Sequence, residues 1–103
     1  MSADRVRLVV VDDHALFRRG LVSLLQDMPE FQVVGEAGDG VQAVEVVVAQ
    51  KPDLVLLDVN MPGMDGVETV QALRQRKIKA HIVMFTISQN EADLLGAIRA
   101  GAD

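Results

Sequence analysis

The feature that most constrains the fold of this chain is a regular alternation of short apolar runs and helical periods. Four runs rich in branched aliphatic residues recur along the sequence, and each is followed by a segment whose apolar residues repeat every three or four positions. A run that is apolar at successive positions is typical of a strand buried on both faces, as in a parallel sheet. We therefore expect strands over residues 6–11, 31–34, 54–57 and 82–85.

The segments between these runs have the apolar spacing of helices. Their periodicity predicts helices through residues 17–25, 41–48, 67–73 and 94–101. The second of them is expected to carry four valines on its inward face, Val41, Val44, Val47 and Val48. The glycine-rich segment 35–40 is expected to be a loop. A βα unit repeated four times predicts a three-layer α/β fold, with a parallel sheet, helices on both faces and right-handed crossovers.

Composition excludes several classes of protein. A length of 103 residues is one domain, and the absence of cysteine excludes a disulfide scaffold and a thiolate metal site. The 15 acidic and 10 basic side chains give a net charge of −5, which disfavours binding of nucleic acid by this domain's own surface. No apolar run has the length of a membrane span or of an export signal, so we expect a cytoplasmic protein.

Polar residues stand at the carboxyl ends of the expected strands. Asp12 and Asp13 follow the first strand, Asp58 ends the third and Thr86 follows the fourth. Because ligands of parallel α/β sheets bind beyond the carboxyl ends of the strands, we expect these side chains to converge. Three neighbouring carboxylates repel one another unless a cation neutralises them, and Mg²⁺ prefers oxygen ligands. Asn60 is placed to add its main-chain oxygen to such a site.

A carboxylate beside Mg²⁺ can accept a phosphoryl group and become an acyl phosphate. Asp58 is the candidate acceptor, and the Thr86 hydroxyl could donate a hydrogen bond to the transferred group. Ordinary structural roles remain open, because Asp13 could cap the first helix and Thr86 could be β-branched filling. His14 is interpreted as a surface residue of the first turn, and Arg18 as part of a solvated helix face.

The sequence resembles a known family, the receiver domain of two-component response regulators. Three stretches carry the resemblance: Val9-Val10-Val11-Asp12-Asp13-His14, Leu57-Asp58-Val59-Asn60-Met61-Pro62-Gly63-Met64-Asp65-Gly66 and Phe85-Thr86. The start of the first helix, the segment 35–37 and the closing segment 99–103 look most like the LuxR-type subfamily of transcription regulators. The resemblance covers the whole chain and implies a flavodoxin-like fold.

The resemblance also implies roles for individual residues. Asp58 would be the phosphoacceptor, and Asp12 and Asp13 the acidic pair, with Asp13 the more direct Mg²⁺ ligand. Asn60 would supply its main-chain oxygen to the metal, and Thr86 would be the switch hydroxyl. A sensor histidine kinase would donate the phosphoryl group to a protein that is no enzyme beyond assisting its own phosphorylation and dephosphorylation. Members of the subfamily carry a C-terminal helix-turn-helix domain that binds DNA, and a homodimer is expected.

One departure from the family is visible in the sequence. The family has five βα units in the sheet order 2-1-3-4-5, and a lysine at the end of the fifth strand, whereas this chain has four units and no lysine after a fifth strand. We therefore expect residues 1–103 to be a receiver domain truncated after the fourth βα unit, from a longer regulator with a C-terminal DNA-binding domain. The fourth strand should then be an exposed apolar edge, and the missing helix should leave one face of the sheet uncovered.

Two other functions are compatible with parts of the sequence. A pseudo-receiver would keep the fold and act as a dimerisation or interaction module without phosphorylation; the complete Asp12, Asp13, Asp58 and Thr86 set argues against it. A phosphatase with Asp58 as nucleophile would be expected to carry a second acid two residues later, where this chain has Asn60.

Overall fold

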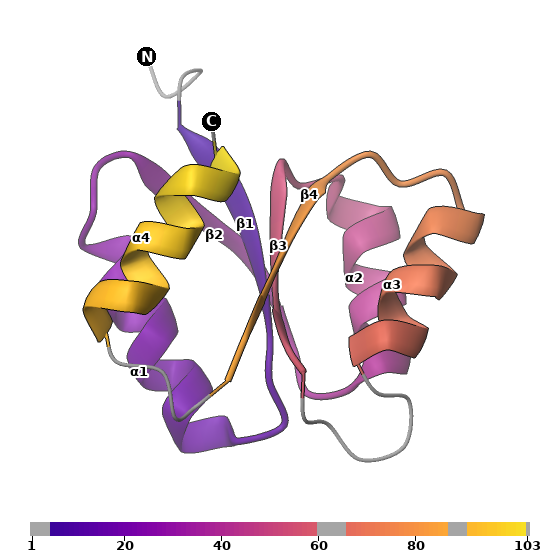
Figure 1. Ribbon diagram of the computed structural model, residues 1–103, viewed down its shortest axis with the longest axis horizontal. Helices are drawn as coiled ribbons and strands as arrows, with labels where there is room; N and C mark the ends of the chain where they lie inside the picture. The colour runs from indigo at the N-terminus through magenta and orange to yellow at the C-terminus, as the bar shows by residue number, and fades with distance from the viewer. Residues whose placement is uncertain (1–4, 60–65, 87–90, 103) are drawn as a thin grey trace.

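The computed structural model describes residues 5–59, 66–86 and 91–102, and it shows a three-layer α/β fold (Figure 1). Strands and helices alternate in the order β1 (Val6–Val11), α1 (Ala15–Gln26), β2 (Phe31–Ala37), α2 (Gly40–Gln50), β3 (Leu54–Asp58), α3 (Gly66–Gln75), β4 (His81–Phe85) and α4 (Glu91–Ala102). The strands form one parallel sheet in the order β2-β1-β3-β4, which confirms the predicted flavodoxin-like class. No helix in the described ranges is long and apolar enough to cross a bilayer.

The two central strands carry the core. All residues of β3 are buried, and the last four residues of β1 have no exposed surface. Their side chains alternate between two apolar clusters, one on each face of the sheet. A strand covered on both faces needs apolar residues at successive positions, which is why these strands were recognisable as continuous apolar runs.

The expected loop over 35–40 is wrong in its first half. Strand β2 continues to Ala37, because Gly35 pairs with Val9 of β1. A Cβ atom on Gly35 would lie 2.6 Å from Cγ1 of Val46 in α2. The glycine therefore permits a close helix–strand approach within the sheet, and it does not mark a turn.

The inward face of α2 is also narrower than predicted. Val44 and Val47 are buried together with Ala43, as an apolar stripe on a helix requires. Val41 and Val48 are 58% and 38% exposed, so their predicted inward orientation is wrong. Both lie at the flank of the buried stripe, and Val48 lines a cavity described below.

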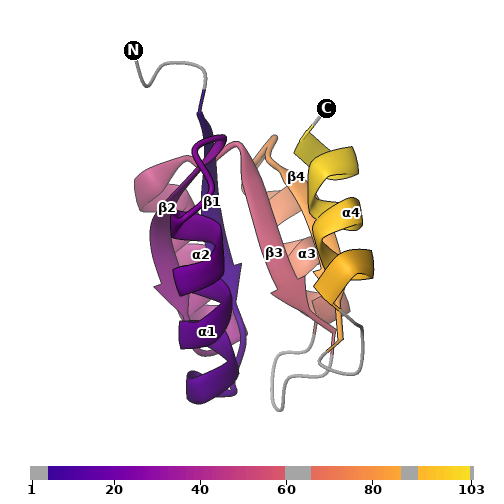
Figure 2. The same cartoon turned by 90° about the vertical axis from the view of Figure 1, so that its left-hand side faces the viewer.

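Helix α4 lies on the same face of the sheet as α1, while α2 and α3 cover the other face (Figures 1 and 2). Leu94 and Ile98 of α4 belong to the core cluster that α1 builds, and the rings of Phe17 and Phe85 stack with centroids 5.9 Å apart. The prediction that one face would be left uncovered is therefore wrong. Strand β4 is the edge of the described sheet, as predicted, and its Met84 is 37% exposed.

The handedness of the connections makes this position of α4 unusual. From β2 to β3 and from β3 to β4 the chain moves toward the same edge of the sheet, and α2 and α3 lie on the same face. Helix α1 leads in the opposite direction and lies on the opposite face, as right-handed crossovers demand. A right-handed connection from β4 to a further strand outside it would place its helix on the α2–α3 face. Helix α4 occupies the other face.

Candidate functional site

The carboxyl ends of β1 and β3 bring an acidic cluster together. These strands are neighbours in the sheet and pair through Val11 and Leu57, so the residues that follow them lie side by side. Possible ligand atoms of four residues all lie within 4.8 Å of one another: Asp12, Asp13, His14 and Asp58. The structure thus assembles the three carboxylates singled out in the sequence, together with one imidazole.

The carboxylates of the cluster are largely shielded from water. Asp12 has no exposed surface, the Asp58 side chain is 1% exposed and that of Asp13 is 23% exposed. Burial raises the pKa of Asp12 above its ordinary value, and the charge of Asp58 adds to the rise, although hydrogen bonds with His14 oppose it. Oδ2 of Asp12 is buried without a hydrogen-bond partner among the described residues. A cation is the natural partner for such an oxygen.

His14 belongs to this cluster, which the sequence interpretation missed. Its main-chain nitrogen donates to Oδ1 of Asp12 at 2.8 Å, and its Nδ1 lies 3.2 Å from the same oxygen and 3.0 Å from Oδ1 of Asp13. Nδ1 is also 3.9 Å from Oδ2 of Asp58. The hydrogen bond with Asp12 raises the pKa of the imidazole, and the charge of Asp13 adds to this. The ring is half exposed, but its place next to the Asp-Asp pair was the signal that could have identified it.

Asp13 lies in the turn before α1, where it could have been the capping residue of the helix. The N-cap residue of α1 is His14, which has no side-chain capping bond, so Asp13 does not cap the helix. Its carboxylate is directed instead into the cluster.

Arg18 supports the loop that carries Asp12. Its guanidinium donates to the main-chain oxygen of Asp12, and its Nε donates to Oε1 of Glu36 at 3.2 Å. The side chain is only 19% exposed, so its interpretation as part of a solvated face is wrong. Because Glu36 belongs to β2, Arg18 ties the end of β1 to the neighbouring strand through α1. Helical periodicity alone carries no signal for this contact, which depends on where β2 lies.

Thr86 lies at the same edge of the sheet. Phe85, the last residue of β4, pairs with Asp58, and the Val59 nitrogen donates to the Phe85 oxygen at 3.0 Å. Thr86 follows directly and is half-buried. Asn60 lies outside the described residues, so its contribution stays a prediction.

The donor set fits a hard divalent cation. Three carboxylates offer oxygen atoms, among them the buried Oδ2 of Asp12, which has no hydrogen-bond partner in the described ranges. The mutual repulsion of the carboxylates falls when a cation enters. Mg²⁺ takes few ligands from protein and keeps several waters. This preference suits the present site, because it is half exposed at the His14 ring. Asp58, at the end of a central buried strand, is held rigidly beside the acidic pair.

Comparisons with known proteins find a matching family. The family profile of the response regulator receiver domain matches residues 8–103. The chain is 43% identical over 96 residues to the nitrate/nitrite response regulator protein NarL of Escherichia coli, a match that covers 93% of this chain and 44% of the relative. It is 43% identical over 102 residues to NarP of the same organism, covering 99% of this chain and 47% of that protein.

A solved structure has a similar fold. The signal receiver domain of a NarL response regulator from Mycobacterium tuberculosis superposes with a TM-score of 0.77 at 40% identity, covering 96% of this chain and 80% of that domain. The present chain spans less than half the length of the NarL and NarP relatives from Escherichia coli.

Proposed function

The chain belongs to the response regulator receiver family, with NarL-type transcription regulators as relatives, and from this premise we propose that it is a phosphorylation-dependent signalling switch. Asp58 is the proposed phosphoacceptor, and a sensor histidine kinase the proposed donor. Receiver domains are in general regulators and not catalytic enzymes. The proposal gives this chain no reaction beyond assistance to its own phosphorylation and dephosphorylation.

The observation that carries the proposal is the position of Asp58 within 4.8 Å of two further carboxylates at the carboxyl edge of the sheet. In the proposed transfer, one carboxylate oxygen of Asp58 forms a bond to phosphorus while the bond between phosphorus and the donor's imidazole nitrogen breaks. The imidazole leaves after taking up a proton, and the product on Asp58 is an acyl phosphate. The rigid end of β3 positions the acceptor for this in-line displacement.

Asp12, Asp13 and Asp58 are the proposed Mg²⁺ ligands, with the main-chain oxygen of Asn60 as a further one. When bound, the cation supplies charge neutralisation for the transferring group and for the crowded carboxylates. The protein's own contribution is to hold these ligands: the His14 nitrogen fixes one Asp12 oxygen, and Arg18 fixes the main chain behind it. The Thr86 hydroxyl is proposed to donate a hydrogen bond to the phosphoryl group.

The proposed output is control of transcription through a C-terminal helix-turn-helix domain that binds DNA. The similarity to the transcriptional regulatory protein DegU of Brevibacillus brevis, 36% identical over 102 residues, supports this proposal. So does the fact that the NarL and NarP relatives are more than twice as long as the matched region. Phosphorylation would add about 1.5 to 2 negative charges at the cluster and shift the population between two conformations. A homodimer and a cytoplasmic location complete the proposal.

The experiment is phosphorylation by a small-molecule donor. Wild type is incubated with acetyl phosphate and MgCl₂ and analysed by intact mass spectrometry, with Asp58→Ala as the test variant. Asp27→Ala is the matched control, because Asp27 is an exposed carboxylate at the end of α1. We expect wild type and the control to gain one phosphoryl group and Asp58→Ala to gain none.

A wild type that gains no mass would contradict the proposal. In that case beryllofluoride with Mg²⁺, followed by amide NMR shifts, identifies the alternative. A pseudo-receiver would show no shifts at the ends of β1, β3 and β4.

A further inference from the structure

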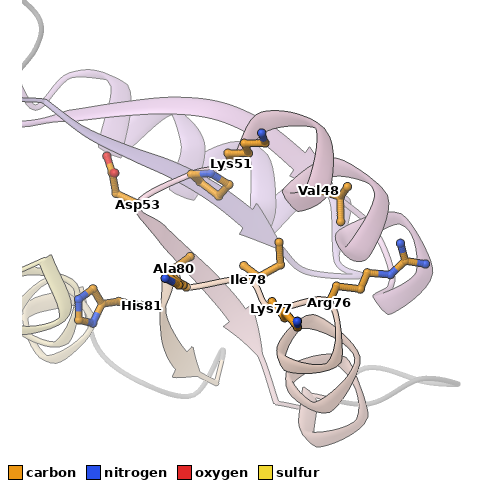
Figure 3. A pocket seen from close by; sticks show the side chains of 10 residues that line it. Val48, Lys51, Asp53, Arg76, Lys77, Ile78, Ala80 and His81 are labelled. Carbon is orange, nitrogen blue, oxygen red and sulfur yellow. The ribbon is translucent and has the colours of Figure 1, made fainter.

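A cavity lies at the end of the sheet opposite the carboxylate cluster. This cavity of about 830 Å³ opens between the last turn of α2 and the turn after α3, at the amino ends of β3 and β4 (Figure 3). Four cationic side chains line it, Lys51, Arg76, Lys77 and Lys79. They include all three lysines of a chain whose net charge is −5. Four of the ten basic side chains of this acidic protein therefore lie around one cavity.

These cations are exposed and carry no ion pair among the residues that the structure describes. The acid that lines the cavity, Asp53, accepts a hydrogen bond from the main-chain nitrogen of Arg7 at 2.9 Å. The guanidinium of Arg7 in turn donates to the main-chain oxygen of Lys51 at 3.0 Å. The lysine and arginine heads thus remain available to a ligand.

The backbone at two of these positions is strained. Lys51 and Lys77 have φ angles of 49° and 61°, and they are the non-glycine residues with positive φ in the described ranges. Each ends a helix: the Lys51 nitrogen donates to the Val47 oxygen and the Lys77 nitrogen to the Arg74 oxygen, both at 2.9 Å. Glycine is the favoured residue at such a position, because it has no Cβ. Strained residues gather at functional sites, so two lysines here indicate a use for their side chains.

An apolar floor lies between the cations. Val48 is 38% exposed, Ile78 is half-buried, and Pro52 and Ala80 are buried beneath them. Figure 3 shows Lys51 on the α2 side and Lys77 on the α3 side, with Ile78 between them. The cavity therefore combines an apolar contact surface with positive charge on both sides.

We propose that this cavity binds an acidic peptide segment of a partner protein. Its carboxylates would face Lys51, Lys77 and Lys79, and an apolar side chain would pack on Val48 and Ile78. Charge complementarity of this kind steers association and selects the partner. The inference goes beyond the proposed phosphorylation switch and needs none of its chemistry.

Two other ligands fit less well. A nucleic acid would meet the net charge of −5, and no phenylalanine, tyrosine or tryptophan lines the cavity for base stacking. A single small anion would lie against two helix carboxyl ends, whose partial charge is negative, and would leave the apolar floor unused. A peptide places its charges at the rim and its apolar side chain in the middle.

The location separates this surface from the phosphorylation site. Strand β3 runs from the cavity to Asp58 and spans about 13 Å. A partner bound at its amino end leaves the carboxyl edge open to a phosphodonor. Absence of peptide binding would therefore not contradict the proposed phosphorylation switch. Absence of phosphorylation at Asp58 would likewise not contradict peptide binding at the cavity.

The test uses the 103-residue chain and a fluorescein-labelled octapeptide of aspartate and glutamate with one central leucine. Fluorescence anisotropy is measured at low salt and at roughly tenfold higher salt, where exposed charges are screened. We expect binding at low salt that weakens several-fold at high salt, and no binding of the peptide with asparagine and glutamine in place of the acids. Amide NMR shifts should map to residues 48–53 and 76–81.

Variants distinguish the site from net charge. Lys77→Gln with Lys79→Gln should weaken binding about fivefold, since exposed ion pairs are individually weak. Arg19→Gln with Arg99→Gln removes the same charge elsewhere on exposed helix surfaces and should leave binding unchanged. Lys77→Gly should also weaken binding while its unfolding midpoint stays equal or rises, because glycine accommodates the positive φ. A loss of binding in that variant is then not a loss of folding.

Four outcomes would overturn the proposal. They are absence of peptide binding at low salt, equal loss in the two double variants, amide shifts confined to other surfaces, and tighter binding of a single-stranded oligonucleotide of equal charge.

Discussion

Replacement of Asp12 by asparagine should stabilise the metal-free protein while impairing its response to Mg²⁺. Asp12 is fully buried, and the ligand atoms of Asp13 and Asp58 lie within 4.8 Å of its own. Asparagine keeps an oxygen that can accept from the His14 nitrogen, and it removes one negative charge. The substitution thus relieves repulsion without removing the local hydrogen bond.

The expected magnitude follows from the separation of the charges. Two carboxylates at the outer limit of 4.8 Å repel by about 3.5 kcal/mol at an effective dielectric constant of about 20. The nearby His14 imidazole and the partial exposure of Asp13 offset much of this, so we expect a net gain of about 1 to 2 kcal/mol. For a domain of this size, that gain raises the melting temperature by about 4 to 16 °C.

The gain should depend on pH. Because the pKa of Asp12 is raised in the folded state, the folded protein binds this proton more tightly than the unfolded chain does. The stability from that protonation is complete below the ordinary aspartate pKa of 3.8, and it is lost as pH rises through the raised value. His14, whose pKa is also raised, loses its favourable contribution as pH rises further. The advantage of the asparagine variant should therefore be small in acid and grow toward alkaline pH.

Thermal denaturation followed by far-ultraviolet circular dichroism measures these effects with and without MgCl₂. At a Mg²⁺ concentration of ten times its dissociation constant, wild type should gain about 1.4 kcal/mol, and Asp12→Asn should gain clearly less. Asp27→Asn, at an exposed position outside the cluster, is the control and should behave as wild type. A variant that melts at or below wild type without metal, or equal gains with Mg²⁺, would refute the reasoning.

Two further predictions concern packing. Gly35→Ala would place a methyl group 2.6 Å from Cγ1 of Val46 and should lower the free energy of unfolding by about 1 to 3 kcal/mol in urea titrations. A Cβ atom on Gly20 would have no neighbour within 4 Å, so Gly20→Ala should raise the free energy of unfolding by about 0.5 to 1 kcal/mol. Equal changes in the two variants would contradict the packing argument. Cysteines replacing Glu30 and Arg99, which pair at 3.4 Å, should be joined by a short bis-maleimide in this otherwise cysteine-free chain. A longer chain with a fifth βα unit outside β4 should lose the cross-link, and its persistence there would contradict the handedness argument.

The sheet and the three aspartates of the site were accessible from sequence for the same reason. A strand covered on both faces must be apolar at every position, so the central strands are recognisable without knowledge of their neighbours. Polar residues at the ends of such runs mark the carboxyl edge, where the topology of parallel strands brings them together. Asp12 and Asp58 are 46 positions apart, yet this rule places them side by side.

The contacts of His14 and Arg18 were not accessible in this way. Both residues are compatible with an exposed helix start, and only the positions of the neighbouring strands turn His14 toward the carboxylates and Arg18 toward Glu36. Gly35 was predicted to lie in a loop. Its closeness to Val46 could not be predicted, because it depends on how α2 packs on β2. The cavity beside Lys51 likewise depends on two turns that meet only in the folded chain.

What the sequence by itself determined is therefore the set of strands and helices, the parallel sheet and the edge at which its acidic residues gather. The tertiary structure alone decided that α4 covers the face of α1, that the acidic cluster includes an imidazole, and that the lysines surround one cavity. The physical reason is that apolar periodicity records which side chains must leave water, a property of each segment alone. Apolar periodicity does not show which surface these side chains pack against, because that packing depends on contacts between segments distant in sequence.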